Sequence, residues 1–109
     1  MSTEYENIVK LKGYIGNKPK LLKTLNNKTV LTVQLSTKAS WALENGKRKE
    51  KTSWHRAVFW GSLAKAAMSA NISEGSQIEI IGHIEYNDYI KGDKTYHNTD
   101  IIIEKFTIL

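Results

Sequence analysis

With 109 residues, 40% of them hydrophobic, the chain is long enough for one domain with its own core, and the absence of cysteine excludes disulfides, thiolate catalysis and cysteine-ligated zinc. No apolar run is long enough to span a membrane, and the acidic first residues are unlike a signal peptide, so we expect one cytoplasmic domain over 1–109 with a flexible leader at 1–6. The net charge of +5 is compatible with a nucleic-acid ligand and equally with a merely soluble surface.

The first third of the chain has the pattern of two strands. Alternation of apolar and polar residues over 8–15 predicts a half-buried strand, and Gly13 within it indicates a bulge or a bend. The sequence GNKP at 16–19 is typical of a turn, and the two asparagines at 26–27 are typical of a hairpin connection. The alternation returns over 29–37, which predicts the second strand.

The middle of the chain contains three segments with different residue patterns. Residues 38–52 are mostly polar and are expected to form a long loop, and 53–60 follows as the third strand. Over 62–71 the apolar residues recur at helical spacing, which predicts a helix. Ser62 is the candidate cap of this helix.

The last third predicts two more strands, at 77–89, with Gly82 inside it, and at 95–109, joined by a turn at 90–94. The order of three strands, one helix and two strands predicts a mainly β fold. We expect a five-stranded Greek-key barrel of the oligonucleotide/oligosaccharide-binding (OB) type, with one helix between the third and fourth strands. An open sandwich is the alternative, although a lone helix at that position is unusual for it. The fold alone does not define a ligand.

Positive charge and aromatic residues gather in the predicted loop, in the strand after it and at the 90–94 turn. Trp41 in the loop is hard to explain as core of a barrel that the strands already fill, and Tyr89 borders the turn. Basic side chains that follow phosphates, together with aromatic rings that stack on unpaired bases, are typical of single-stranded nucleic-acid binding. The candidate phosphate-binding residues are Lys38, Lys47, Arg48, Lys49, Lys51, Arg56, Lys91 and Lys94.

The third strand has two faces, which side-chain alternation separates. One face holds Trp54, Arg56, Val58 and Trp60, and the other holds His55, Ala57 and Phe59. The arginine favours solvent or a ligand on the first face, whereas the valine and the usual burial of strand tryptophans favour a core. The pattern leans toward a ligand-facing row of Trp54, Arg56 and Trp60, with the second face used for packing.

The stretch TSWHRAVFWGSLAKAA (52–67) closely resembles the third-strand-to-helix signature of bacterial-type single-stranded DNA-binding (SSB) proteins. The resemblance covers nearly the whole chain. It continues through NIVKLKGYIGNKP (7–19), LTVQLSTKASW (31–41), EGSQIEIIGHIEY (74–86) and TYHNTDIIIEKFTIL (95–109).

This resemblance implies an OB-fold barrel that usually assembles as a homotetramer and coats single-stranded DNA without catalysis. We expect it to protect single-stranded DNA in replication, recombination or repair, and we expect no cofactor and no metal. The family's base-stacking positions fall on Trp41, Trp54, Trp60 and Tyr89. The family often has phenylalanine at the third of these and tryptophan at the fourth, and both remain aromatic here. His55 falls where the family places a residue near the subunit interface.

The sequence also departs from the family pattern. Ser62 stands where a basic residue is common and Glu74 falls near another such position, while Glu85 and Asp88 add acid beside Tyr89. The chain ends at the expected end of the barrel, without the acidic-tipped tail through which family members recruit other proteins. We therefore expect either a piece of a longer protein or a short accessory member from a phage, plasmid or other mobile element.

The sequence fits other functions less well. The main alternative is a primosomal or recombination accessory protein, a homodimer that hands single-stranded DNA to a helicase or recombinase. An enzyme is disfavoured because no nucleophile–base signature or phosphate-cradling glycine loop is present. His83 and His97 could meet across paired strands, but two histidines without a third ligand make a weak metal site. A secreted sugar-binding barrel is disfavoured because signal peptide and cysteines are lacking.

Overall fold

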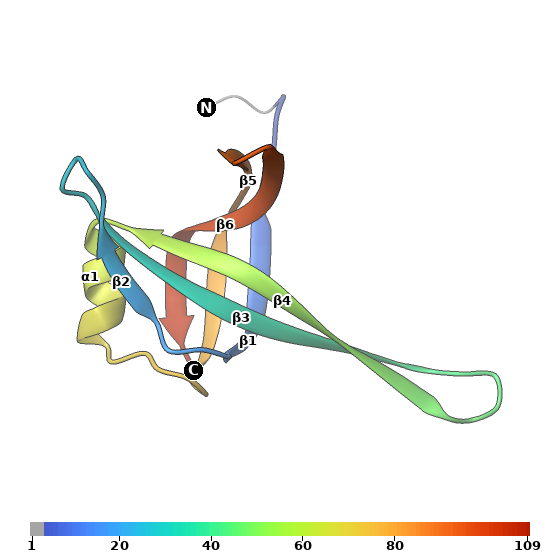
Figure 1. Cartoon of the computed structure of the whole chain (residues 1–109). Coiled ribbons are helices and arrows are strands. Elements are labelled where there is room, and N and C mark those ends of the chain that lie inside the picture. The colour runs from blue at the N-terminus through green and yellow to red at the C-terminus, as the bar shows by residue number, and fades with distance from the viewer. Residues whose placement is uncertain (1–3) are drawn as a thin grey trace.

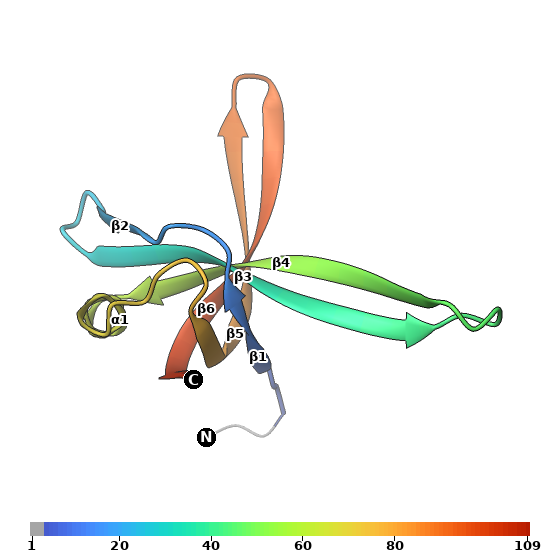
Figure 2. The ribbon, with the colours of Figure 1, turned by 90° about the horizontal axis from the view of Figure 1, so that it is seen from below.

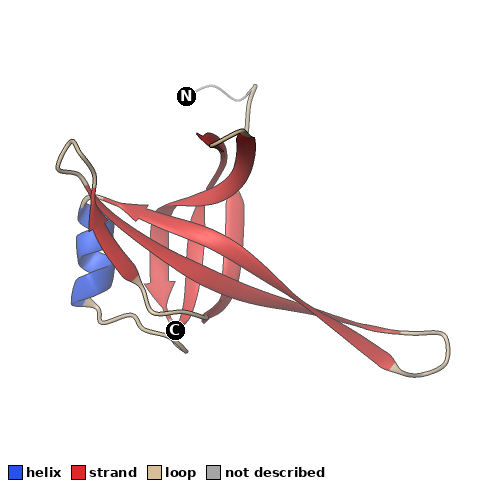
Figure 3. Cartoon of the chain, viewed as in Figure 1, coloured by secondary structure: helices blue, strands red, loops and turns tan. Residues whose placement is uncertain are grey.

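Six strands and one helix make up the described part of the chain, residues 4–109, in the computed structural model (Figures 1 and 3). Part of the expected leader, residues 1–3, lies outside the described residues, and residues 4–8 precede the first strand as exposed chain. In chain order the elements are β1 (Val9–Ile15), β2 (Lys20–Lys23), β3 (Thr29–Ala42), β4 (Arg48–Trp60), α1 (Ser62–Ser69), β5 (Gln77–Lys91) and β6 (Lys94–Ile108).

Five of the strands close into a barrel. The sheet order is β1-β5-β6-β4-β3-β2, and β1 also pairs with β3 through Tyr14↔Ser36 and Ile15↔Leu35, which closes the ring. All pairs are antiparallel except β4 with β6. Together with the helix between β4 and β5, this order confirms the predicted OB-type barrel. The short β2, which pairs with β3, was not predicted because its residues KLLK are all exposed and do not alternate.

The two strand glycines have different roles. The pairing of β1 with β5 runs through Gly13 without a shift in register. A side chain there would collide with the backbone oxygen of Ser36, so glycine permits the close approach that closes the barrel. The bulge predicted at Gly13 is therefore not found in the β1–β5 register, whereas at Gly82 the register of β5 and β6 does shift, next to Ile81, as a β-bulge would cause.

The prediction of a long loop over 38–52 was wrong. β3 and β4 continue as one antiparallel ribbon from Val30↔Trp60 to Ala42↔Arg48, and only residues 43–47 form the turn. This extension, the β3–β4 arm (residues 38–52), leaves the barrel and is exposed on both faces, so it shows no apolar alternation from which a strand could be predicted. The tip of the β5–β6 hairpin (residues 86–99, the β5–β6 arm) projects in another direction (Figure 2).

The helix covers one end of the barrel. It begins at Ser62, but the residue that caps it is Gly61, which has a φ of 57° and makes no side-chain capping bond, so the prediction of a Ser62 cap was wrong. Ala64 and Ala67 are its buried residues. In the described part of the chain, no helix has the length and apolar character needed to cross a membrane.

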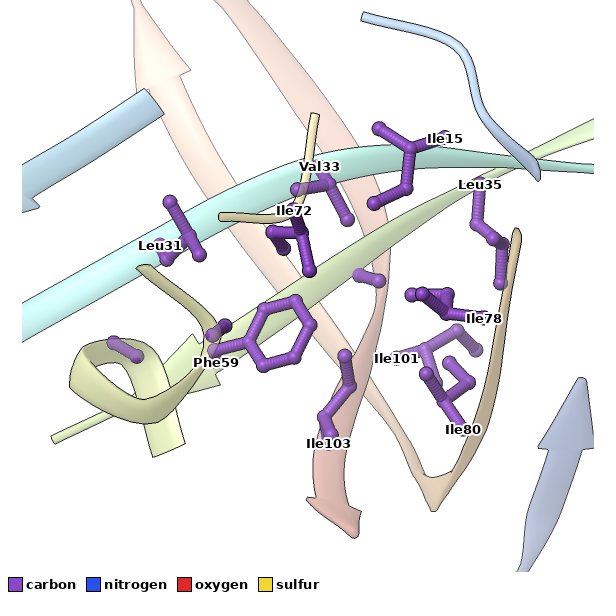
Figure 4. Packing of buried hydrophobic residues seen from close by; sticks show 13 residues of the cluster. Ile15, Leu31, Val33, Leu35, Phe59, Ile72, Ile78, Ile80, Ile101 and Ile103 are labelled. Carbon is purple, nitrogen blue, oxygen red and sulfur yellow. The ribbon is translucent and has the colours of Figure 1, made fainter. Parts of the chain in front are cut away.

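The barrel interior is filled by aliphatic side chains from all five barrel strands, with one phenylalanine among them (Figure 4). Phe59 is fully buried and meets Phe106 edge-on, with ring centroids 5.3 Å apart. Ala57 is also fully buried. The packing face predicted for the third strand is therefore confirmed at these two residues, and the core is complete without any of the three tryptophans.

Candidate nucleic-acid interface

The outward face of the β3–β4 sheet carries two exposed tryptophans. Trp54 lies opposite Ser36 and is 58% exposed, and Trp60 lies opposite Val30 and is 41% exposed. Between them on the same face, Val58 is only 4% exposed. A core role for either tryptophan is excluded by this exposure, because residues that fill a core are almost wholly removed from solvent.

The indole of Trp54 rests on the turn that follows β1. A side chain on Gly16 would overlap the six-membered ring of Trp54, so the ring lies directly against this glycine. The Gly16 N–H donates to the carbonyl of Gln34 on β3, at 2.9 Å, which ties the turn to the sheet. The backbone thus supports the ring on one side and leaves the remainder open to solvent.

Trp60 lies between two hollows in the surface. One, of about 590 Å³, holds the basic side chains of Lys28 and Lys65. Neither lysine was predicted as a phosphate-binding residue, because they lie on the β2–β3 connection and on α1 and meet only in space. The other hollow, of about 300 Å³, is called the central groove. It is lined by Leu22, Val30, Thr32, Arg56, Val58, Trp60, Glu85, Asn87, Asp100 and Ile102.

The charge of Arg56 in the central groove is balanced by an acid. Its Nε lies 3.0 Å from Oδ1 of Asp100, which is 8% exposed. Asn87 donates through Nδ2 to Oδ2 of the same carboxylate, at 3.0 Å. The sequence predicted Arg56 as a phosphate-binding residue without a partner, because the parallel contact between β4 and β6 joins residues far apart in the chain.

The β3–β4 arm places its candidates on two faces. The pairing of β3 with β4 has no register shift, so alternation puts Trp41 on the face opposite to Trp54. Lys49 and Lys51 share the face of Trp41, whereas Lys38 and Arg48 share that of Trp54. Arg48 donates through Nη2 to Ser40 Oγ at 3.0 Å, and Lys47 lies in the turn. The arm is therefore basic on both sides.

Tyr89 lies on the β5–β6 arm, directly opposite Tyr96. The two rings stack, with centroids 5.0 Å apart and planes inclined by 14°. One face of Tyr89 is therefore covered, and the pair presents a joint aromatic surface beside Lys91 and Lys94 near the arm's tip. Tyr96 was not among the predicted site residues.

The three histidines are each paired within the chain. His55 is half-buried, and its Nε2 lies 2.9 Å from Thr37 Oγ1. Hydrogen bonds with Glu85 first, and with Glu104, raise the pKa of His83 above its usual value. His97 contacts Asp88 at 2.8 Å.

The possible meeting of His83 with His97 is not found. His83 lies opposite Ile102, and His97 lies opposite Asp88, further along the hairpin. Over residues 4–109, no group of three or more His, Asp or Glu side chains is arranged to hold a metal ion.

A model of the single-strand binding protein family matches residues 6–109. This chain belongs to the single-strand binding protein family. The resemblance stated from the sequence is thereby confirmed.

Similar proteins carry the same name. The single-stranded DNA-binding protein 1 of Chlorobaculum tepidum is 33% identical over 106 residues, which cover 94% of this chain and 64% of that protein. The single-stranded DNA-binding protein of Xanthomonas axonopodis is 32% identical over 104 residues, covering 94% and 57%. This chain therefore spans less than two thirds of the length of these relatives.

Solved structures share the fold of this family member. A Plasmodium falciparum SSB in complex with ssDNA matches with a TM-score of 0.87 at 22% identity, over 100% of this chain and 99% of that one. The single-stranded DNA binding protein of Thermus aquaticus, as a deletion mutant, matches with a TM-score of 0.82 at 22% identity, over 95% and 50%. At this level of identity the matches establish the fold.

Proposed function

We propose that this protein binds single-stranded DNA without sequence preference, by stacking bases on exposed aromatic rings and contacting phosphates through lysine and arginine. The observation that carries the proposal is the pair of half-exposed tryptophans on one outward barrel face, beside Arg56, in a protein whose core is complete without them. Each stacked base contributes about 1–3 kcal/mol, and every base offers a ring to stack on. Duplex DNA conceals those rings, so single strands are preferred.

The proposed contacts form three groups. Trp54 and Trp60 stack bases on the barrel, the phosphates there being held by Arg56 with Lys28 and Lys65. Trp41, with Lys38, Lys47, Arg48, Lys49 and Lys51, extends the surface along the β3–β4 arm, and Tyr89, with Lys91 and Lys94, extends it along the β5–β6 arm. Phosphate contacts release bound counterions, so affinity falls as salt rises.

We further propose a homotetramer, with His55 near a subunit contact. Support comes from large apolar side chains that are exposed around β1, among them Ile8 and Tyr14, because exposed apolar patches mark association surfaces. We also propose that the protein protects single-stranded DNA in replication, recombination or repair, in the cytoplasm; the family and the names of the relatives support the DNA binding itself. Those names give no support to the accessory alternative.

The test is a titration followed by tryptophan fluorescence, with a single-stranded oligonucleotide and a duplex of equal length. The single strand is expected to quench the emission strongly, less so at higher salt, and the duplex to quench it far less. Equal binding of both would refute the stacking model. Light scattering of the free protein is expected to give about four times the 12.4 kDa chain mass; twice that mass would support a dimer, and a monomer would refute the assembly.

A further inference from the structure

An acidic residue lies in the wall of the surface that is proposed to bind a polyanion. Asp100 lines the central groove together with Arg56 and Trp60. Electrostatics alone predicts that a carboxylate at this place weakens DNA binding, because it repels phosphates. Its contacts indicate a different effect.

The Asp100 carboxylate is buried, and each of its two oxygens contacts one neighbouring side chain. Oδ2 accepts a hydrogen bond from Asn87, and Oδ1 forms an ion pair with Arg56 Nε at 3.0 Å. Oδ1 is buried and makes no directed hydrogen bond within residues 4–109. Moving the Arg56 side chain away would therefore leave a buried carboxylate oxygen without compensation, which is costly.

Strand pairing sets this geometry. Asp100 is directly opposite Arg56 in the parallel β4–β6 ladder, and it is opposite Glu85 in the antiparallel β5–β6 ladder. Glu85 precedes Asn87 by two residues on β5. Three strands of the barrel thus converge on one carboxylate. The ion pair is anchored on regular strands, which hold side chains more precisely than loops do.

A guanidinium tethered at Nε keeps the N–H donors of its two terminal nitrogens for a ligand. The Arg56 side chain is still 48% exposed, and it lines the groove that Trp60 borders. A free arginine would lose much rotamer freedom on binding a phosphate, and a side chain that is held in place beforehand loses less.

We propose that Asp100, supported by Asn87, is a positioning residue for single-stranded DNA: it fixes Arg56 in the central groove so that the terminal nitrogens meet a phosphate of the strand stacked on Trp60. This inference rests on the proposed function. The consequence is that this acidic residue on the binding surface raises the affinity for DNA, where charge repulsion alone would lower it.

The experiment compares the affinities of variants for one single-stranded oligonucleotide. Asp100→Asn keeps the shape and removes one negative charge, and it is expected to weaken binding roughly 2- to 10-fold. Glu85→Gln is the matched control, since it removes an acid from the wall of the same groove and is expected to leave the affinity unchanged or to raise it. Asp100→Asn binding as tightly as the parent protein, or more tightly, would overturn the inference.

A second comparison separates positioning from a general structural effect. In an Arg56→Ala background, Asp100→Asn is expected to cause no further loss and to raise the affinity slightly, because only charge repulsion remains. An equal loss in both backgrounds would overturn the positioning role. If Asp100→Asn unfolds, Asn87→Ala tests the same set of contacts by removing the hydrogen bond to Asp100 from an exposed side chain. A smaller loss of affinity for DNA is then expected, and an unchanged affinity would contradict the inference. A parent protein that does not bind the oligonucleotide would overturn the proposed function itself.

Discussion

Replacing Trp54 with alanine tests whether its ring binds a ligand or stabilises the fold. The side chain is 58% exposed, so less than half of the ~1.5–3 kcal/mol gained by burying a large apolar side chain is at stake. We therefore expect a loss of roughly 1 kcal/mol or less in the free energy of unfolding. A base that stacks on the ring contributes about 1–3 kcal/mol, which corresponds to roughly 5- to 150-fold in affinity.

The matched control is Phe59→Ala, on the same strand but with a fully buried ring. Its expected cost is about 3–5 kcal/mol of stability, because it removes buried area and leaves a cavity. Urea unfolding followed by circular dichroism measures both losses, and titration of Trp54→Ala with a single-stranded oligonucleotide measures the affinity. If Trp54→Ala is destabilised as much as Phe59→Ala, or binds DNA unchanged, the reasoning is refuted.

Three further predictions concern neighbouring features. Gly16→Ala displaces the ring of Trp54 and weakens binding several-fold with little loss of stability; unchanged affinity and unchanged tryptophan emission would contradict this. Tyr96→Ala removes the ring that stacks on Tyr89 and is expected to weaken the free energy of DNA binding by about 0.5–1.5 kcal/mol. Tighter binding would contradict this and would mean that Tyr89 stacks bases better without Tyr96. The raised pKa of His83 stabilises the fold fully below about pH 6.5, and this contribution is lost as the pH rises through the folded-state pKa. His83→Gln should therefore lower the melting temperature more at about pH 5.5 than at about pH 8.5; an equal effect at both would rule the contribution out.

The barrel could be predicted from sequence because its inner face leaves a regular signal. Leu31, Val33 and Leu35 alternate with polar residues, and all three are fully buried. The β3–β4 arm could not be predicted in the same way, since both of its faces meet solvent and the ribbon is held by backbone pairing that leaves no pattern in residue type. Gly61 replaced Ser62 as the helix cap because the chain enters α1 at positive φ, which favours glycine.

The candidate site shows the same limit. Trp54 and Trp60 could be assigned to one face by alternation, since that depends only on spacing along one strand. Asp100 could not be connected to Arg56, because their contact arises from a parallel pairing across the closed barrel. The exposure of individual side chains could therefore be predicted from the sequence more readily than the contacts between them.

The position of the two tryptophans on a single strand also sets a length scale. They are separated by six strand positions, which corresponds to roughly 20 Å at the rise of a β-strand. Two rings that far apart cannot enclose one base between them. In the proposed stacking mode each ring receives its own base, with several nucleotides bridging the gap, so a dinucleotide engages only one ring. In the proposed stacking mode, the spacing along the strand therefore favours a polymer over free nucleotides, whatever the order of the bases.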